Sequence, residues 1–382
     1  MNNIPFNRPY KTGKELQYIE ESHQNNKLSG DGLFTQRCHI WLQEQAKSPK
    51  ALLTHSCTAA LEMAALLLDI SPGDEIIMPS YTFVSTANAF VLQGGKPVFV
   101  DIREDTLNID EQLIEAAISS RTKAIVPVHY AGVGCEMETI MSIAKRHDLM
   151  LIEDAAQGVM ASYQDKILGS IGDLGTYSFH DTKNVISGEG GALLVNNPDL
   201  AIRAEVIREK GTDRSRFLRG EIDKYTWQDL GSSFLPSDMI AAFLWAQLEE
   251  AKYITEQRLL IWNYYHALLD PLEASGMLRR PIVPINCNHN AHMYYVLLPP
   301  EINRTTILSR LKEKGIYATS HYVPLHSSQA GQRFGKAHGN LALTDSLSQR
   351  IIRLPLWIGL EHCQQELIIE NLRDTIDYSC FK

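Results

Sequence analysis

The fold is decided by a stretch near the middle of the chain, Leu149-Met150-Leu151-Ile152-Glu153-Asp154-Ala155-Ala156-Gln157. Its short apolar run is typical of a buried strand, and the two carboxylates mark the end of that strand. Apolar runs of the same kind precede it at 75–78, 97–101 and 124–128, with starts roughly 25 residues apart, which is the room that a strand, a helix and two loops need. We therefore predict an α/β fold with a mainly parallel sheet that helices cover on both faces.

Ligands of such sheets bind beyond the carboxyl ends of the strands, and three polar features fall there. Asp154 ends one strand, and Lys183 lies in a short loop between two apolar segments, 175–179 and 192–195. A carboxylate can keep a ring nitrogen protonated, and a desolvated lysine can act as a Schiff-base amine. The alternatives are that Asp154 caps a helix and that Lys183 is a surface residue, as most lysines are.

The third feature is the hydroxyl-rich turn before an apolar helix at 58–63. Ser56 and Thr58 can cap that helix, and its free N–H groups with these hydroxyls suit a phosphate. Plain helix capping explains the same residues equally simply. Neither a Gly-x-Gly-x-x-Gly fingerprint nor a P-loop is present in the sequence, so dinucleotide and P-loop nucleotide sites lack their phosphate loops.

The second half of the chain predicts a smaller α/β domain. We expect one long helix from Asp238 to Leu269, with Asp238 as its cap and Pro271 just past its end. Strands are expected at 292–298 and 317–323, and helices at 304–314 and 361–376. The domain prediction is an N-terminal arm over 1–30, a large domain over 31–250 and a small C-terminal domain over 251–382.

Composition narrows the function classes. The chain has 382 residues, is 44% hydrophobic, and carries a net charge of -9, so no bulk positive field would attract nucleic acid or anionic lipid. We see no secretory signal and no apolar stretch that could span a bilayer, and the six cysteines are scattered, so we expect a cytoplasmic protein with free thiols. Cys287, His289 and His292 form an incomplete ligand set, and we expect no metal.

Four motifs together carry a family resemblance. They are Ser-Cys-Thr-Ala-Ala-Leu-Glu (56–62), Pro-Ser-Tyr-Thr-Phe-Val-Ser-Thr-Ala-Asn-Ala (79–89), Glu-Asp-Ala-Ala-Gln (153–157), and Ser-Phe-His-Asp-Thr-Lys-Asn (178–184) with Gly-Glu-Gly-Gly (188–191). In this order they resemble the sugar aminotransferases of the DegT/DnrJ/EryC1/StrS family. The resemblance implies a pyridoxal 5'-phosphate enzyme of fold type I, the aspartate aminotransferase-like fold, with a large domain and a smaller C-terminal α/β domain.

The resemblance also implies roles for single residues. Lys183 would form the Schiff base with the cofactor, Asp154 would pair with the pyridine nitrogen, and Gln157 would contact the phenolic oxygen. Phe83 would stack on the ring, while Ser178 and the backbone at Cys57 and Thr58 would hold the phosphate. In the family an asparagine of the neighbouring subunit reaches the phosphate. Ser233 stands at that place here, so we expect a homodimer with shared sites in which the shorter hydroxyl of Ser233 replaces the asparagine.

The reaction implied is transfer of an amino group from L-glutamate to a nucleotide-linked 4-keto-6-deoxyhexose. Three further stretches, 30–32, 208–215 and 223–227, resemble the branch of the family that acts on dTDP-linked 4-keto-6-deoxyglucose. Candidate substrate residues are Arg214, Arg219 and Lys224 for the diphosphate, and His326 and His180 near the sugar or phosphate. A sister enzyme acting at C3 or on another nucleotide sugar, and a non-catalytic nucleotide-sugar-binding protein, remain as alternatives.

Overall fold

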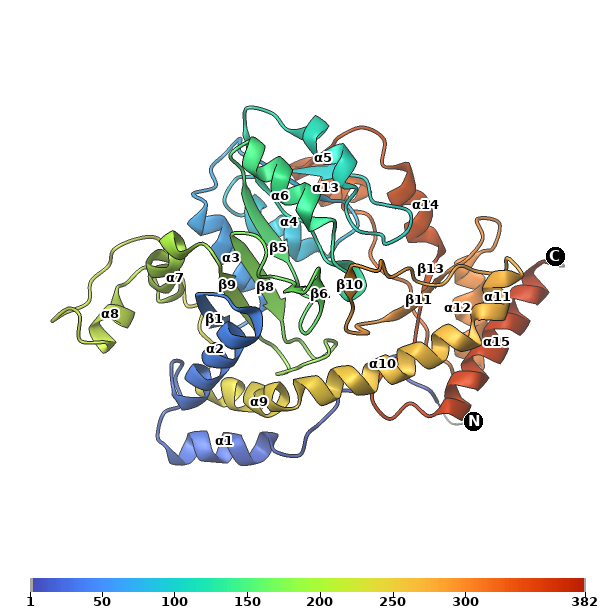
Figure 1. The fold of residues 1–382 in the computed structure, drawn as a ribbon, viewed down its shortest axis with the longest axis horizontal. Helices are drawn as coiled ribbons and strands as arrows, with labels where there is room; N and C mark the ends of the chain where they lie inside the picture. The colour runs from blue at the N-terminus through green and yellow to red at the C-terminus, as the bar shows by residue number, and fades with distance from the viewer. Residues whose placement is uncertain (1–2, 381–382) are drawn as a thin grey trace.

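A computed structural model describes residues 3–380 of the chain, and an eight-stranded sheet lies at its centre (Figure 1). The strand order is β1-β9-β8-β5-β4-β2-β3-β12, and every neighbouring pair is parallel except those that β9 makes. The prediction of a mainly parallel sheet is therefore confirmed. The strands are β1 Lys50–Thr54, β2 Glu75–Pro79, β3 Lys96–Val100, β4 Thr122–Ile125, β5 Met150–Asp154, β8 Leu174–Ser178, β9 Gly191–Val195 and β12 Lys336–Ala337.

Helices cover both faces of this sheet, because successive strand side chains point to opposite sides. In β5, for example, Leu151 packs into one hydrophobic core and Ile152 into the other. The first face carries α2 Leu33–Ala46, α5 Glu111–Ala117, α6 Met137–Arg146 and α9 Asp238–Glu249, and the second carries α3 Cys57–Leu67, α4 Val84–Val91 and α7 Ala201–Arg208.

A separate core lies in the C-terminal part of the chain. There the antiparallel pair β11 Tyr294–Leu297 and β13 Ile351–Leu354 packs against α10 Ala251–Leu268, α12 Arg304–Glu313 and α15 His362–Cys380. Figure 1 shows α9 and α10 running end to end from the large sheet to these C-terminal helices. The remaining elements are α1 Glu15–Gln24, α8 Arg214–Leu218, α11 Asp270–Ala274, α13 Gln329–Phe334, α14 Ala342–Arg350, β6 Ser162–Tyr163, β7 Lys166–Ile167, β10 Cys287–Asn288 and three 3₁₀ turns, Tyr130–Gly132, Pro198–Leu200 and Leu325–Ser327.

The expected long helix from Asp238 to Leu269 is wrong in two details. It is interrupted at Glu250, and its cap is Ser237, whose hydroxyl accepts from the N–H of Ile240. Asp238 instead accepts hydrogen bonds from the N–H groups of Phe34 and Thr35, at 3.4 and 2.8 Å. The carboxylate therefore serves the start of another helix, α2, which only the tertiary fold brings near it.

The expected strand over 317–323 is also wrong. Apart from one isolated bridge between Thr319 and Arg353, this segment has no ladder partner within the described chain. Pro271 does not follow the long helix as a stop but starts the short helix α11. The domain boundaries at residues 30 and 250 stay a prediction.

The N-terminal segment crosses the C-terminal part toward the large sheet. Ile4 exchanges backbone hydrogen bonds with Gly315 and Tyr317, and the carbonyl of Pro5 accepts from the indole of Trp357 at 3.1 Å. Asn7 then donates to the carbonyl of Asp181 at 3.3 Å. Residues 4–7 thus tie the C-terminal part to the loop that carries Lys183.

The sequence predicts no membrane-spanning helix, no metal site and no disulfide, and residues 3–380 can be searched for these features. In that range no helix is long and apolar enough to cross a membrane, and no three His, Cys, Asp or Glu residues are grouped to hold a metal ion. His292 instead pairs with Asn184 at 3.0 Å, and His289 packs on Trp262. The five cysteines with described side chains are free, and the side chain of Cys380 lies outside the description.

Candidate active site

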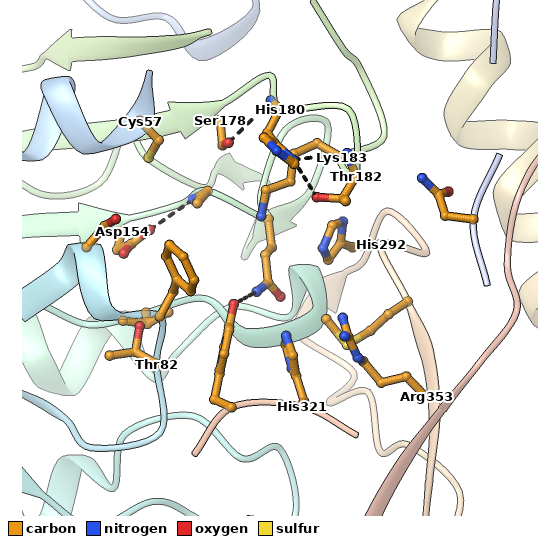
Figure 2. Close-up of a pocket in the computed structure, with 18 of the residues that line it drawn as sticks. Cys57, Thr82, Asp154, Ser178, His180, Thr182, Lys183, His292, His321 and Arg353 are labelled. Carbon is orange, nitrogen blue, oxygen red and sulfur yellow. Dashed lines mark hydrogen bonds between the residues drawn. The ribbon is translucent and has the colours of Figure 1, made fainter. Parts of the chain in front are cut away.

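A cavity of about 630 Å³ opens at the carboxyl ends of the parallel strands, between the large sheet and the C-terminal part (Figure 2). Its walls come from the starts of α3 and α4, the ends of β5 and β8, the loop around Lys183, and segments 320–322 and 353–356. The structure brings eight of the predicted site residues to this cavity: Cys57, Thr58, Phe83, Asp154, Gln157, Ser178, His180 and Lys183.

Lys183 lies in the connection over residues 179–190 between the antiparallel strands β8 and β9. Its N–H donates to the carbonyl of His180 at 2.9 Å, and its side chain enters the cavity. Burial lowers the pKa of the Lys183 amine; the charges of Cys57 and Asp154 oppose this effect, and that of Arg353 adds to it. A lowered pKa enlarges the fraction of neutral, nucleophilic amine near neutral pH.

Asp154 is the last residue of β5 and is buried, with 5% of its surface exposed. Its Oδ2 accepts from the hydroxyl of Thr86 at 2.7 Å, and its Oδ1 accepts from the N–H of Ala156 at 3.2 Å. The Thr86 hydroxyl lies 2.8 Å from that of Thr82. Because Thr86 gives its single proton to Asp154, Thr82 is the donor in that second bond. These donors stabilise the charged carboxylate.

The N-terminus of α3 forms a candidate anion-binding site. Ser56 caps the helix by accepting from Ala59 at 3.0 Å, whereas the N–H groups of Cys57 and Thr58 have no hydrogen-bond partner in residues 3–380. The backbone of Gly191 lies against the start of α3. A Cβ at this position would stand 2.4 Å from the nitrogen of Cys57, so a larger residue would crowd that N–H group. Two open N–H groups at the positive end of a helix are well placed for a phosphate.

The opposite wall is aromatic. Gln157 accepts from the N–H of Ala131 at 2.7 Å and donates to the hydroxyl of Tyr322 at 2.9 Å. The ring of His321 stacks on Tyr322 with centroids 3.6 Å apart, and its Nδ1 lies 2.6 Å from the hydroxyl of Tyr130. Burial, and then the positive charges of Arg353 and Lys183, lower the pKa of His321 well below its usual value. His321 is therefore a neutral hydrogen-bonding group at neutral pH.

Five predicted site residues do not reach the cavity of their own chain. Arg214 pairs with Glu209 at 2.9 Å, and Arg219 pairs with Glu205 and Glu221. His326 lies against Ser80 and Asp345, with its Nδ1 2.7 Å from the Ser80 hydroxyl. Ser233 and Lys224 are exposed and lie outside the residues that line the cavity. Roles for these residues in the site of a neighbouring subunit stay predictions.

Sequence reasoning missed several cavity residues. Thr82 and Thr86 lie inside the quoted motif 79–89, but Thr82 precedes helix α4, and only Thr86 contacts Asp154 while Thr82 contacts Thr86. His292, His321, Tyr322 and Arg353 come from the C-terminal part. The sequence marks His292 only as part of an incomplete metal-ligand set and gives Arg353 no role, because only the packing of that part against the large sheet brings these residues to the cavity.

The cavity fits a phosphorylated pyridine aldehyde. It offers an amine for the aldehyde in Lys183, an anionic carboxylate for the ring nitrogen in Asp154, and open N–H groups for the phosphate at Cys57 and Thr58. A hydroxyl at Ser178 and an aromatic ring at Phe83 complete the lining. This site, on a sheet of this topology, defines a pyridoxal-phosphate enzyme of fold type I.

Comparison with known proteins gives the family. The chain belongs to the DegT/DnrJ/EryC1/StrS aminotransferase family, whose model matches residues 9–373. It is 32% identical to the spore coat polysaccharide biosynthesis protein SpsC of Bacillus subtilis, over 98% of this chain and 97% of that protein. It is 31% identical to GDP-perosamine synthase of Caulobacter vibrioides, over 95% and 96% of the two chains.

A solved structure agrees. The crystal structure of a DegT DnrJ EryC1 StrS aminotransferase from Brucella abortus superposes with a TM-score of 0.86 at 28% identity, covering 94% of this chain and 95% of that one. The family resemblance, the fold type and the cofactor expected from the sequence are confirmed. The protein is a pyridoxal-phosphate-dependent sugar aminotransferase.

Proposed function

We propose that the enzyme transfers the amino group of L-glutamate to C4 of dTDP-4-keto-6-deoxy-D-glucose, giving dTDP-4-amino-4,6-dideoxy-D-galactose and 2-oxoglutarate. The observation that carries the aminotransferase chemistry is the placement of Lys183 and Asp154 in one buried cavity beside the open start of α3. Pyridoxal phosphate, when bound, supplies an electron sink that makes proton removal from the substrate carbon feasible.

The chain's own residues supply the remaining steps. Lys183 would hold the cofactor through Nζ, and its amine, when free, would be the base nearest the donor Cα. The same amine returns the proton during amino transfer. Asp154 would accept a hydrogen bond from the ring N–H, and it is positioned by the hydrogen bonds that it accepts from Thr86 and Ala156. Gln157 would contact the phenolic oxygen of the ring, and the N–H groups of Cys57 and Thr58 with the hydroxyl of Ser178 would hold the phosphate.

The choice of sugar rests on resemblance. The relative named GDP-perosamine synthase supports a nucleotide-linked amino sugar as product, although its nucleotide is GDP. Gly-Asp-Gly (30–32), Arg-Glu-Lys-Gly-Thr-Asp-Arg-Ser (208–215) and Asp-Lys-Tyr-Thr-Trp (223–227) resemble the transaminase that makes this dTDP-linked product for enterobacterial common antigen. We infer a place in cell-surface polysaccharide biosynthesis, and a cytoplasmic enzyme, from the same resemblance.

The proposal includes a homodimer with shared sites. Arg214, Arg219 and Lys224 lie on and after α8, which projects from the body of the molecule in Figure 1. A projecting segment can reach a neighbouring subunit, where these cations would meet the diphosphate and Ser233 would approach the phosphate. His326 is a candidate for a contact to the sugar, and His180 for a contact to the phosphate or the substrate.

A spectroscopic experiment tests the proposed function. The purified yellow enzyme should lose its absorbance on addition of L-glutamate and regain it on addition of dTDP-4-keto-6-deoxyglucose, and NMR should identify the 4-amino product. Lys183→Ala should fold but lose turnover, because Lys183 is the one lysine among the described residues that lines the cavity. Borohydride reduction followed by peptide mapping should locate the cofactor adduct at residue 183.

Each departure from these results identifies an alternative. A product aminated at C3, or turnover only with another nucleotide, would assign the enzyme to a sister activity. A colourless protein that gains no absorbance with pyridoxal phosphate would indicate a binding protein. An adduct on a lysine other than Lys183 would refute the assignment of the cofactor amine.

A further inference from the structure

One histidine of the cavity has a ring nitrogen that nothing in the described chain binds. His292, in the loop before β11, is buried and lines the cavity. Its Nδ1 lies 3.0 Å from Oδ1 of Asn184, and within residues 3–380 its Nε2 has no hydrogen-bond partner. Figure 2 shows the ring among the side chains that line the cavity. Nε2 is therefore the nitrogen that remains for a ligand.

The partners of Asn184 decide which atoms of this pair carry protons. The amide nitrogen of Asn184 donates to the carbonyl of Asn290 at 2.7 Å, so its oxygen is the atom that meets His292. An amide oxygen can only accept, and Nδ1 of His292 must therefore carry the proton. Burial, followed by the positive charges of Lys183 and Arg258, holds the pKa of His292 well below its usual value. The ring is thus neutral at neutral pH, and Nε2 is a hydrogen-bond acceptor.

The backbone that presents this ring is strained and firmly held. Ala291, the residue before His292, has a φ of 51°, in the left-handed region that a residue with a Cβ adopts only at a cost. Arg258 donates to the carbonyls of Ala291 and His292, at 3.0 and 2.8 Å. The side chain of Asn290 accepts from the N–H of His292 at 3.0 Å and donates to the carbonyl of Gln157 at 2.8 Å. The ring is therefore fixed in place before any ligand arrives.

The two substrates of the proposed reaction differ in what they can offer to a fixed acceptor. L-Glutamate has one hydrogen-bond donor, its ammonium group, and that group is the one that reacts. Its two carboxylates only accept. The hexose of a nucleotide sugar carries hydroxyl groups, and each of them can donate. An unused acceptor in the cavity therefore suits the sugar and not the amino acid.

The reacting carbon narrows the choice of hydroxyl. Asn184, the partner of His292, directly follows Lys183 in the chain, so His292 packs beside the residue whose amine acts at C4. In a 4-keto-6-deoxyhexose the two neighbours of C4 differ, because C3 carries a hydroxyl group and C5 carries a methyl group. Building on the proposed function, we propose that Nε2 of His292 accepts a hydrogen bond from the C3 hydroxyl of the keto sugar and so positions C4 beside the reacting amine.

Two substitutions separate the two nitrogens of the ring. His292→Asn keeps an amide N–H near the place of Nδ1 and leaves nothing at the place of Nε2. In a ping-pong enzyme kcat/KM for each substrate reports on its own half-reaction. His292→Asn should lower kcat/KM for dTDP-4-keto-6-deoxyglucose about 10-fold, because one buried hydrogen bond is lost, and leave that for L-glutamate unchanged. His292→Gln, whose amide oxygen reaches the place of Nε2, should recover part of the loss.

A sugar that lacks the C3 hydroxyl distinguishes a direct contact from a disturbance of the fold. With this 3-deoxy substrate the wild-type enzyme and His292→Asn should have equal kcat/KM, because the group that Nε2 would bind is absent. A structural disturbance would slow both sugars alike. Equal losses with the two sugars, equal losses in the two half-reactions, or no loss at all would overturn the proposal.

His362→Asn is the matched control. His362 is exposed, and its ring stacks on that of Tyr264 with centroids 4.0 Å apart, away from the residues that line the cavity. This variant should keep the wild-type kcat/KM for both substrates.

A calorimetric titration keeps the test independent of turnover. dTDP-6-deoxy-D-glucose has the C3 hydroxyl but no ketone, and it should bind His292→Asn about 10-fold more weakly than the wild-type holoenzyme. If the wild-type enzyme bound this compound but did not aminate the keto sugar, the proposed function would fail while the contact to His292 stood. Equal binding to both proteins, or no binding to the wild-type enzyme, would refute the role of His292.

Discussion

At the scale of single residues, Asp154 is positioned by a chain of two threonine hydroxyl groups. Thr82 donates to Thr86, and Thr86 donates to Asp154, over distances of 2.8 and 2.7 Å in a buried setting. Each donor favours the ionised carboxylate, and the ionised carboxylate is what keeps a ring nitrogen protonated. Thr86 is therefore a positioning residue for Asp154.

We predict that Thr86→Val lowers kcat roughly 10- to 100-fold, because a hydrogen bond to a charged group is removed from a buried site. The isosteric side chain keeps the packing, and Thr86→Ser should restore most of the rate. Steady-state kinetics with both substrates saturating measure the effect, and absorbance titration reports whether the bound cofactor loses its proton at lower pH. A Thr86→Val enzyme with wild-type kcat and an unchanged titration would contradict this role.

The sequence predicts the cavity residues of the large sheet better than those that the C-terminal part contributes. Asp154 and Ser178 end strands β5 and β8, and Lys183 follows in the connection after β8, so the strand pattern brings all three near one edge of the sheet. Arg353 has no such marker. It follows two isoleucines in a short strand, and a lone arginine there is equally compatible with solvent.

At the scale of elements, α2 and β1 are joined by a histidine that must stay neutral. Nε2 of His39 accepts the N–H of Leu53 at 2.9 Å, and a protonated ring could not accept it. Burial, followed by the charge of Arg208, lowers the pKa of His39 to about 3. The unfolded chain binds a proton at this residue below about pH 6.5, while the folded chain does not.

Stability from His39 is therefore complete above about pH 6.5 and is lost as the pH falls toward 3, by about 2 kcal/mol at pH 5. We predict that His39→Gln, whose amide oxygen can still accept from Leu53, flattens the fall in the free energy of unfolding between pH 7 and 5 by about that amount. Urea denaturation of the apoprotein at both pH values measures it. An unchanged difference between the two pH values would show that His39 titrates normally.

Errors in predicting the elements have a common cause. Asp238 and Ser237 both suit a helix start, and only the tertiary contact of α9 with α2 decides that Ser237 caps α9 while Asp238 serves α2. The segment 317–323 alternates like a strand, yet its aromatic residues turn toward Tyr81 and Tyr130 and line the cavity wall. Local pattern cannot show which partner a residue will meet across the fold.

At the scale of the whole molecule, the cross-subunit role of Ser233 can be tested with hybrid dimers. Ser233→Asp would place a carboxylate against the partner's phosphate and weaken cofactor binding, although Ser233 is exposed in its own chain and tolerates the change. Lys183→Ala removes the amine. Refolding the two inactive variants together should restore about a quarter of wild-type activity, because half of the dimers then hold one intact site of two.

This result requires that the two halves of a site come from different chains. If Ser233→Asp alone stays fully active at limiting pyridoxal phosphate, Ser233 does not contact the phosphate. Activity that elutes with a monomer on sizing would exclude the shared site as well.

The N-terminal segment, residues 4–7, has a practical consequence for truncating or tagging this enzyme. A polypeptide trimmed to begin at Tyr10 would retain every strand of the central sheet. It would lack Phe6, whose ring packs against the guanidinium group of Arg353, and Asn7, whose side chain donates a hydrogen bond to the carbonyl of Asp181. Phe6 and Asn7 of the full chain therefore belong to the active-site cavity. An affinity tag is better attached at the C-terminus.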